Sequence, residues 1–139
     1  MSRASHISIV VYKTKWFARF ARKARIGDDA LWRAALAANA GAIDADLGSG
    51  IVKQRVARKG EGTSGGSRTF IVFRSQDRAV YVFGFEKKDQ ANIAPDEWEP
   101  LRKLAKEILS YSEADMAANV RAGELIKIED LEATDGSDL

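Results

Sequence analysis

The chain has 139 residues, with 22 lysine and arginine residues against 20 aspartate and glutamate residues, one histidine and no cysteine. The absence of cysteine excludes disulfides, thiolate metal sites and cysteine nucleophiles, and it is typical of a reducing compartment. The longest apolar run near the N-terminus, residues 7–12, is too short to cross a bilayer, so we expect a cytoplasmic protein.

The net charge of +2 conceals two parts of opposite charge. Residues 1–90 hold 17 basic and 8 acidic side chains, which gives +9, whereas residues 91–139 hold 5 and 12, which gives −7. A basic part of this kind predicts a nucleic-acid surface, or a surface that the acidic part masks. A chance difference between solvated faces is the simpler alternative.

The first part of the chain is predicted to form one strand and two helices. Residues 6–12 are rich in β-branched residues and predict a strand. Thr14 is a good N-cap for a basic helix over residues 15–25, and an alanine-rich helix is predicted over residues 30–40. Helical spacing assigns three tryptophans to the core: Trp16, Trp32 and Trp98.

Three strands are predicted next, over residues 51–57, 68–74 and 78–85. A long loop rich in glycine and serine joins the first two, and residues 75–77 form a tight turn between the last two. Gly84 lies inside the last of these strands, which predicts a bulge or a close backbone approach.

The C-terminal part is predicted to be mainly helical. A helix begins near Pro95, a short helix covers residues 113–122, and residues 125–128 are predicted to add an edge strand. The whole is an α+β domain over residues 1–129, in which the two N-terminal helices pack on a mixed or antiparallel sheet of about four strands. Its core covers about residues 6–111 and its helical extension about residues 112–129, and residues 130–139 form an acidic flexible tail.

Positive charge is concentrated on the hairpin and at the end of the last strand of the sheet. Because side chains alternate across a strand, Lys53 and Arg55 share one face of the second strand. The cations that we expect to meet a polyanion, most simply RNA, are Lys53, Arg55, Arg58, Lys59, Arg68, Lys87 and Lys88. A solvated sheet face is the alternative for Lys53 and Arg55, and a salt bridge to Asp77 or Glu86 is the alternative for Arg68.

The order of elements resembles the RelE/ParE superfamily of bacterial toxins, and most closely its HigB-like branch. Three segments carry the resemblance: YKTKWFARFARKA, the hairpin IDADLGSGIVKQRVARKGEGTSGGSRTFIVFR, and FEKKDQANI. It covers about Tyr12 to Gly123 and implies the toxin of a type II toxin–antitoxin module. Such toxins are metal-independent ribonucleases that cut mRNA, often on the ribosome, and a cognate antitoxin silences them. The resemblance places the working residues at Lys53, Arg55, Arg58, Arg68 and Lys87.

Three positions depart from the pattern of these toxins. Relatives usually carry lysine where Thr63 stands, tyrosine where Ser67 stands and alanine where Glu86 stands. A lost cation, a lost stacking ring and an added carboxylate all weaken a site for RNA. A module that binds RNA or antitoxin without catalysis is therefore one alternative, and a ParE-like gyrase inhibitor is another.

The residues themselves favour an electrostatic ribonuclease. Since His6 is the only histidine, a mechanism with two histidines is excluded. Arg55 and Arg68 are predicted to clamp the scissile phosphate. Lys53, crowded by cations, is predicted to act as the base, and Glu61 or Glu86 is a rival for that role.

The glycine-rich loop is not a nucleotide-binding motif, because it lacks the Gly-Lys-Ser/Thr of a P-loop and a strand follows it. We expect either a lid that contacts the RNA backbone through Arg58, Lys59 and Thr63 or a plain connection. One histidine and scattered acids form no convincing metal site, so no cofactor is expected. The expected antitoxin covers the basic sheet or adds a segment to it.

Overall fold

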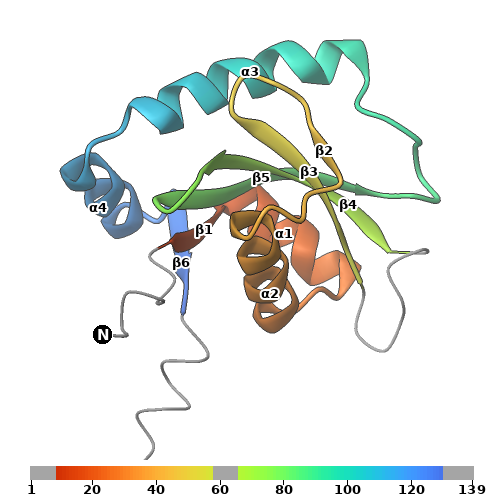
Figure 1. Ribbon diagram of the computed structural model, residues 1–139, viewed down its shortest axis with the longest axis horizontal. Helices are drawn as coiled ribbons and strands as arrows, with labels where there is room; N and C mark the ends of the chain where they lie inside the picture. The colour runs from red at the N-terminus through yellow and green to blue at the C-terminus, as the bar shows by residue number, and fades with distance from the viewer. Residues whose placement is uncertain (1–8, 58–65, 130–139) are drawn as a thin grey trace, which may run out of the picture.

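The computed structural model describes residues 9–57 and 66–129, and the structural statements below refer to these residues. They form one sheet with helices on both faces (Figure 1). The elements are β1 (Val10–Thr14), α1 (Lys15–Ala24), α2 (Asp28–Asn39), β2 (Ala45–Asp46), β3 (Ile51–Val56), β4 (Ser67–Arg74), β5 (Arg78–Glu86), α3 (Pro95–Ser110), α4 (Glu113–Arg121) and β6 (Leu125–Ile128).

The sheet is mixed, with the strand order β2-β3-β4-β5-β1-β6. β1 is parallel to β5, and every other neighbouring pair is antiparallel. The α+β class and the mixed sheet are confirmed, but the described residues form six strands rather than about four. β6, which pairs with β1 at one edge, is the edge strand predicted over residues 125–128. β2, at the other edge, was not predicted; it is only two residues long and depends on its pairing with β3.

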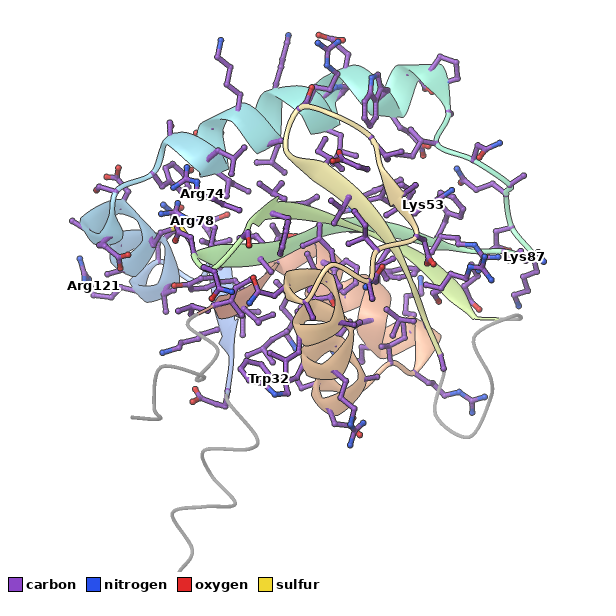
Figure 2. All side chains as sticks on the ribbon, viewed as in Figure 1. Trp32, Lys53, Arg74, Arg78, Lys87 and Arg121 are labelled. Carbon is purple, nitrogen blue, oxygen red and sulfur yellow. The ribbon has the colours of Figure 1, made fainter. Side chains whose placement is uncertain are left out.

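Two apolar clusters hold helices to the two faces of the sheet. On one face, α1 and α2 bury Phe17, Leu31 and Ala35 against strand residues such as Ile71 and Tyr81. On the other face, α3 buries Leu101, Ala105 and Ile108 against the strands, and α4 adds Met116. The longest helix therefore crosses the face that also carries Lys53, as Figure 2 shows.

Gly84 shows the close approach that its place in an aromatic strand predicts. A Cβ atom at this position would lie 2.7 Å from Cε2 of Phe20 and 3.1 Å from the backbone oxygen of Arg68. The irregularity in the β4–β5 ladder lies nearby, between Phe70 and Ile71, where Val82 has no opposite partner. At this bulge Val82 and Phe83 both contribute to the cluster under α3.

The start of α1 follows the local sequence signal. The Thr14 hydroxyl accepts a hydrogen bond from the backbone N–H of Phe17 at 3.1 Å, as an N-cap does. We expect Thr14→Ala to lower the free energy of unfolding by about 1 kcal/mol, because this N–H loses its acceptor. Urea unfolding measures the change, and Thr14→Ser, which keeps the hydroxyl, serves as the control. Equal loss in both variants would contradict the capping role.

Two arginines at the turn between β4 and β5 hold the C-terminal end of α3 (Figure 2). The guanidinium of Arg74 donates to the carbonyl of Leu109, and that of Arg78 donates to the carbonyl of Ile108 at 2.9 Å. Asp77 joins them, 2.8 Å from Nη1 of Arg74 and 3.3 Å from Nε of Arg78. Cations at the negative end of a helix stabilise it.

Asp77 makes this contact sensitive to acid. Burial raises the pKa of its carboxyl, but the hydrogen bonds and charges of Arg74 and Arg78 outweigh burial and hold the pKa below its usual range. The ionised form therefore stabilises the fold above the ordinary value of about 4, and this contribution is lost as the pH falls through the lowered pKa. We expect Asp77→Asn to flatten that part of the pH dependence of urea unfolding. An unchanged pH profile would contradict the assignment.

Candidate nucleic-acid interface

The hairpin of β3 and β4 brings three cations onto one face of the sheet. In the register of the two strands, Arg55 lies directly opposite Arg68, and Lys53 lies opposite Phe70 in the next row of the same face. Val52 and Val56 belong to the cluster under α1 and α2, so the alternating positions Lys53 and Arg55 point to the α3 side. Directly opposite side chains in such a ladder have Cβ atoms about 5 Å apart.

Asp44 holds Arg55 in place from the edge of the sheet. Oδ2 of Asp44 accepts a hydrogen bond from the backbone N–H of Arg55 at 2.6 Å and lies 3.7 Å from Nε. The backbone N–H of Asp44 donates to Oε1 of Gln54 at 3.1 Å, and Gln54 in turn donates to the carbonyls of Ala34 and Ala42. Arg55 remains about half exposed, so it is positioned but still accessible.

Asp44 was not found from the sequence. It lies in an irregular segment eleven residues before Arg55, and its only signal is a carboxylate close to a glycine-rich turn. The contact depends on the pairing of β2 with β3. β2 is too short to produce a periodic pattern of apolar residues from which it could be predicted.

Arg68 is the cation that offers most to an anion. Among the described residues, its Nη1 is buried without a hydrogen-bond partner. Asp77, one of the two carboxylates expected to pair with it, instead contacts Arg74 and Arg78. Neither Arg68 nor Lys53 takes part in an ion pair with another described residue. A buried N–H that lacks an acceptor is costly, and a phosphate oxygen would satisfy it once the guanidinium moves toward the surface.

A shallow apolar pocket adjoins Lys53. It has a volume of about 400 Å³, and its walls include Phe70 of β4, Trp98 of α3 and Ile93 in the segment before α3. We call Lys53, Arg55 and Arg68 the cation row. Phe70 lies opposite Lys53 in the register of β3 and β4, and its ring centroid is 5.9 Å from that of Phe83 and 5.6 Å from that of Phe85. Charge and flat apolar surface therefore meet at the same place on the sheet.

The remaining predicted residues fall in three groups. Lys87 and Lys88 are exposed directly after β5. Lys87 lies at the end of the sheet that is farther from Arg74 and Arg78 (Figure 2). Glu86 lies opposite Ser67, and the alternation of β4 places this pair on the other face from Arg68. The loop residues Arg58, Lys59, Glu61 and Thr63, together with His6, lie outside the described residues.

The described residues bring no three histidine, aspartate or glutamate side chains together as a set of metal ligands. No helix in the described part of the chain has both the length and the apolar character that crossing a membrane requires.

One family model matches this chain. It carries the description RelE toxin of RelE / RelB toxin-antitoxin system, and the match extends over residues 9–128, which is most of the chain. No curated protein matches the chain.

Proposed function

The chain belongs to the RelE family of toxins from toxin–antitoxin systems, and we propose that this toxin is a metal-independent endoribonuclease that cuts mRNA on the ribosome. Family membership implies an antitoxin partner. The ribonuclease activity, the cytoplasmic site of action and the HigB-like branch are parts of the proposal.

One observation carries the proposal: Arg55 and Arg68 lie opposite each other with Lys53 in the next row, and Nη1 of Arg68 is buried without an acceptor among the described residues. Like charges directly opposite one another destabilise a sheet. An arrangement that keeps them side by side, with one N–H lacking an acceptor, suits an anionic ligand. Each guanidinium group has planar N–H donors whose spacing suits the oxygens of a phosphodiester.

These groups support cleavage by the 2′-hydroxyl of the RNA itself. In the proposed reaction the 2′-oxygen attacks the phosphorus, and its proton passes to the side chain of Lys53, the proposed base. The bond to the 5′-oxygen breaks as that oxygen takes a proton from water, and the hydroxide so formed recovers the proton from Lys53. The products are a 2′,3′-cyclic phosphate and a 5′-hydroxyl. Arg55 and Arg68 stabilise the charge that develops on the phosphorane oxygens. The pocket beside Lys53 has room for a nucleobase of the RNA next to the scissile phosphate.

The test is induced expression with mapping of mRNA 5′ ends, together with cleavage by the purified protein. We expect growth arrest, cleaved mRNA and 5′-hydroxyl ends, with a rate unchanged by EDTA because no metal takes part in the proposed steps. Intact mRNA beside damaged DNA would favour the gyrase inhibitor. Salt-dependent RNA binding without cleavage would favour the inactive module.

A further inference from the structure

Two hollows follow one another along α3, on the side of this helix that faces the loop between β2 and β3. The first is the pocket of about 400 Å³ beside Lys53, and the second has a volume of about 670 Å³. Leu47 of the loop lines the first hollow and Ser49 lines the second, so one loop forms a wall of both. On α3 the lining of the first hollow ends at Trp98, and that of the second begins at Glu99. The two hollows are therefore parts of one surface that leads away from the cation row.

The loop that forms the wall is packed directly on α3. Gly50 has a positive φ of 77°, and a Cβ atom at this position would collide with Cδ1 of Leu109. Only glycine combines this backbone conformation with so close an approach. The next residue, Ile51, begins β3, which also carries Lys53 and Arg55. The loop is thus held against the helix on one side and by the strand of the cation row on the other.

The second hollow is basic, although it lies in the acidic part of the chain. Residues 91–139 hold five basic side chains, and three of them, Arg102, Lys103 and Lys106, line this hollow. Arg102 lies 3.3 Å from Glu99 and offsets the charge of that carboxylate. In the described part of the chain, Lys103 and Lys106 are exposed and take part in no ion pair. We call the two hollows together the basic groove, because its far end offers two lysines to an anion.

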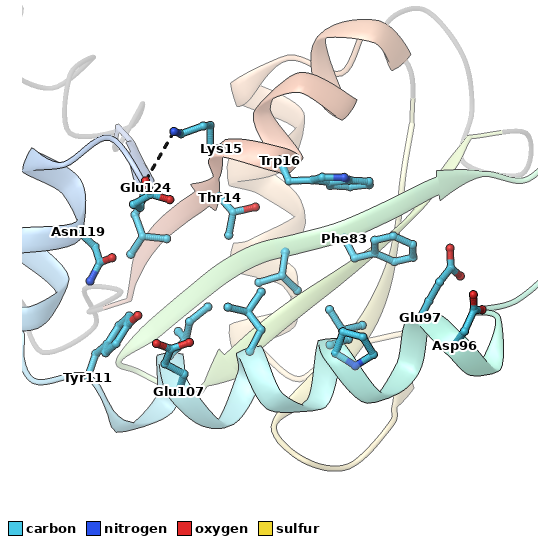
Figure 3. A pocket seen from close by; sticks show the side chains of 16 residues that line it. Thr14, Lys15, Trp16, Phe83, Asp96, Glu97, Glu107, Tyr111, Asn119 and Glu124 are labelled. Carbon is cyan, nitrogen blue, oxygen red and sulfur yellow. Dashed lines mark ion pairs between the residues drawn. The ribbon is translucent and has the colours of Figure 1, made fainter.

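The opposite side of α3 has the opposite charge (Figure 3). There Asp96, Glu97 and Glu107 line an apolar groove of about 750 Å³. Trp16 also lines it; this residue was expected in the core, but its exposed fraction is 44%, because its ring stacks on Phe83 at the edge of this groove, with centroids 5.0 Å apart. Carboxylates repel the backbone of a nucleic acid. A strand of RNA that leaves the cation row is therefore directed to the side of α3 that carries the basic groove.

The length of the basic groove sets how much RNA it holds. Trp98 lines the pocket beside Lys53, and Lys106 lies eight residues further along the helix, which is a distance of about 12 Å. A stacked strand rises by about 3.4 Å per nucleotide, so this distance corresponds to about three to four nucleotides. A nucleobase in the first hollow thus places the phosphates that follow it beside the lysines of the second.

We propose that the basic groove binds the substrate RNA strand beyond the scissile phosphate, with Lys103 and Lys106 in contact with its phosphates. This proposal rests on the proposed ribonuclease function, and it extends the site from the cation row by about three to four nucleotides. Contacts to phosphates carry no sequence information, so these lysines raise the affinity for any single strand that is long enough to reach them. The protein therefore favours a single-stranded stretch that continues past the cleavage point.

The probes are fluorescent 2′-O-methyl oligoadenylates of about 4 and about 12 nucleotides, which attack by a 2′-hydroxyl cannot cleave. Fluorescence anisotropy measures their affinity for the full chain between about 50 and about 200 mM salt. Lys103→Gln combined with Lys106→Gln should bind the longer probe about fivefold more weakly, because two exposed ion pairs are lost. The slope of log K against log salt should become shallower by about 1.4, since each contact to a single strand contributes about 0.7. The shorter probe, which the cation row holds, should bind this variant as it binds the wild type.

The matched control is Arg121→Gln combined with Lys127→Gln, which removes the same charge from exposed positions outside the basic groove. Figure 2 shows Arg121 on α4, away from Lys53. This variant should bind both probes as the wild type does, because net charge alone does not place a cation beside the RNA.

Each other outcome has a distinct meaning. Equal weakening by the two double variants, or an unchanged affinity of the Lys103→Gln, Lys106→Gln variant for the longer probe, would overturn the groove, and cleavage of RNA by the wild type would leave the ribonuclease function standing. A loss that appears only on purified ribosomes would also overturn the groove, because the lysines would then contact ribosomal RNA. A wild-type chain that binds neither probe and cleaves no RNA would overturn both proposals.

Discussion

Replacing Lys53 and Arg68 together by alanine is expected to lower the rate of mRNA cleavage at least about 10³-fold and to relieve growth arrest. Removal of one well-aimed donor to developing charge costs about 10²–10³ in rate, and groups that act as a unit lose less than the product of their single effects. Arg68 supplies the donor that has no acceptor among the described residues, and Lys53 supplies the proposed base. Cleavage of a defined RNA, with mapped 5′ ends, measures the change.

The controls separate chemistry from folding. Arg33→Ala removes an exposed cation of α2 that contacts Asp29 at 3.4 Å, and we expect wild-type cleavage. Arg68→Lys keeps the charge but loses the planar pair of donors, and it should give an intermediate rate. Thermal unfolding establishes that each variant is folded. A folded double variant that cleaves at the wild-type rate would exclude this cation row as the site.

The largest effect on stability is expected from Arg78→Ala, at about 3 kcal/mol in the free energy of unfolding. The side chain is 5% exposed, contacts Asp77 at 3.3 Å and donates to the carbonyl of Ile108. Breaking a buried pair costs roughly 3–5 kcal/mol, and the lower end applies because Asp77 keeps Arg74 and is partly exposed. Urea unfolding measures the loss.

A comparison on the same turn tests whether burial is the cause. Arg74→Ala removes a cation of which 44% is exposed, and screening by water should limit its effect to below about 1 kcal/mol from the ion pair with Asp77. Equal destabilisation by the two variants would show that the buried position of Arg78 has no special weight. Since the turn lies away from Lys53, neither change should alter the proposed RNA-binding residues directly (Figure 2).

Local signals predicted many of the element boundaries. Thr14 caps α1 as predicted, and the short helix predicted from residue 113 does begin at Glu113, where Ser112 and Asp115 form a reciprocal cap. In each case a capping side chain satisfies backbone N–H groups of the first turn. The first strand was predicted over residues 6–12, of which residues 6–8 lie outside the described residues, and β1 continues beyond the predicted end to Thr14. Its position is set by the parallel register with β5, where Val10 lies opposite Arg78, and no local pattern contains that register.

For the candidate site, the sequence predicted which cations share a face of one strand, and the structure showed which cations of the two strands lie opposite each other. Alternation places Lys53 with Arg55 regardless of the rest of the fold. That Arg55 lies directly opposite Arg68 depends on the register across the long loop, and that Asp44 holds Arg55 depends on the short strand β2. Both are contacts between segments distant in the chain.

By itself, the sequence determined the α+β class, the helical and strand periods, and the segregation of charge, because these follow from neighbouring residues and composition. Only the tertiary structure decided that α3 crosses the face that carries Lys53, that Trp16 is left exposed, and that the acidic side chains frame an apolar groove. The physical reason is that the backbone geometry of a helix or a strand fixes which of its own side chains lie on the same face. Which element each face then meets is decided by packing across the whole domain.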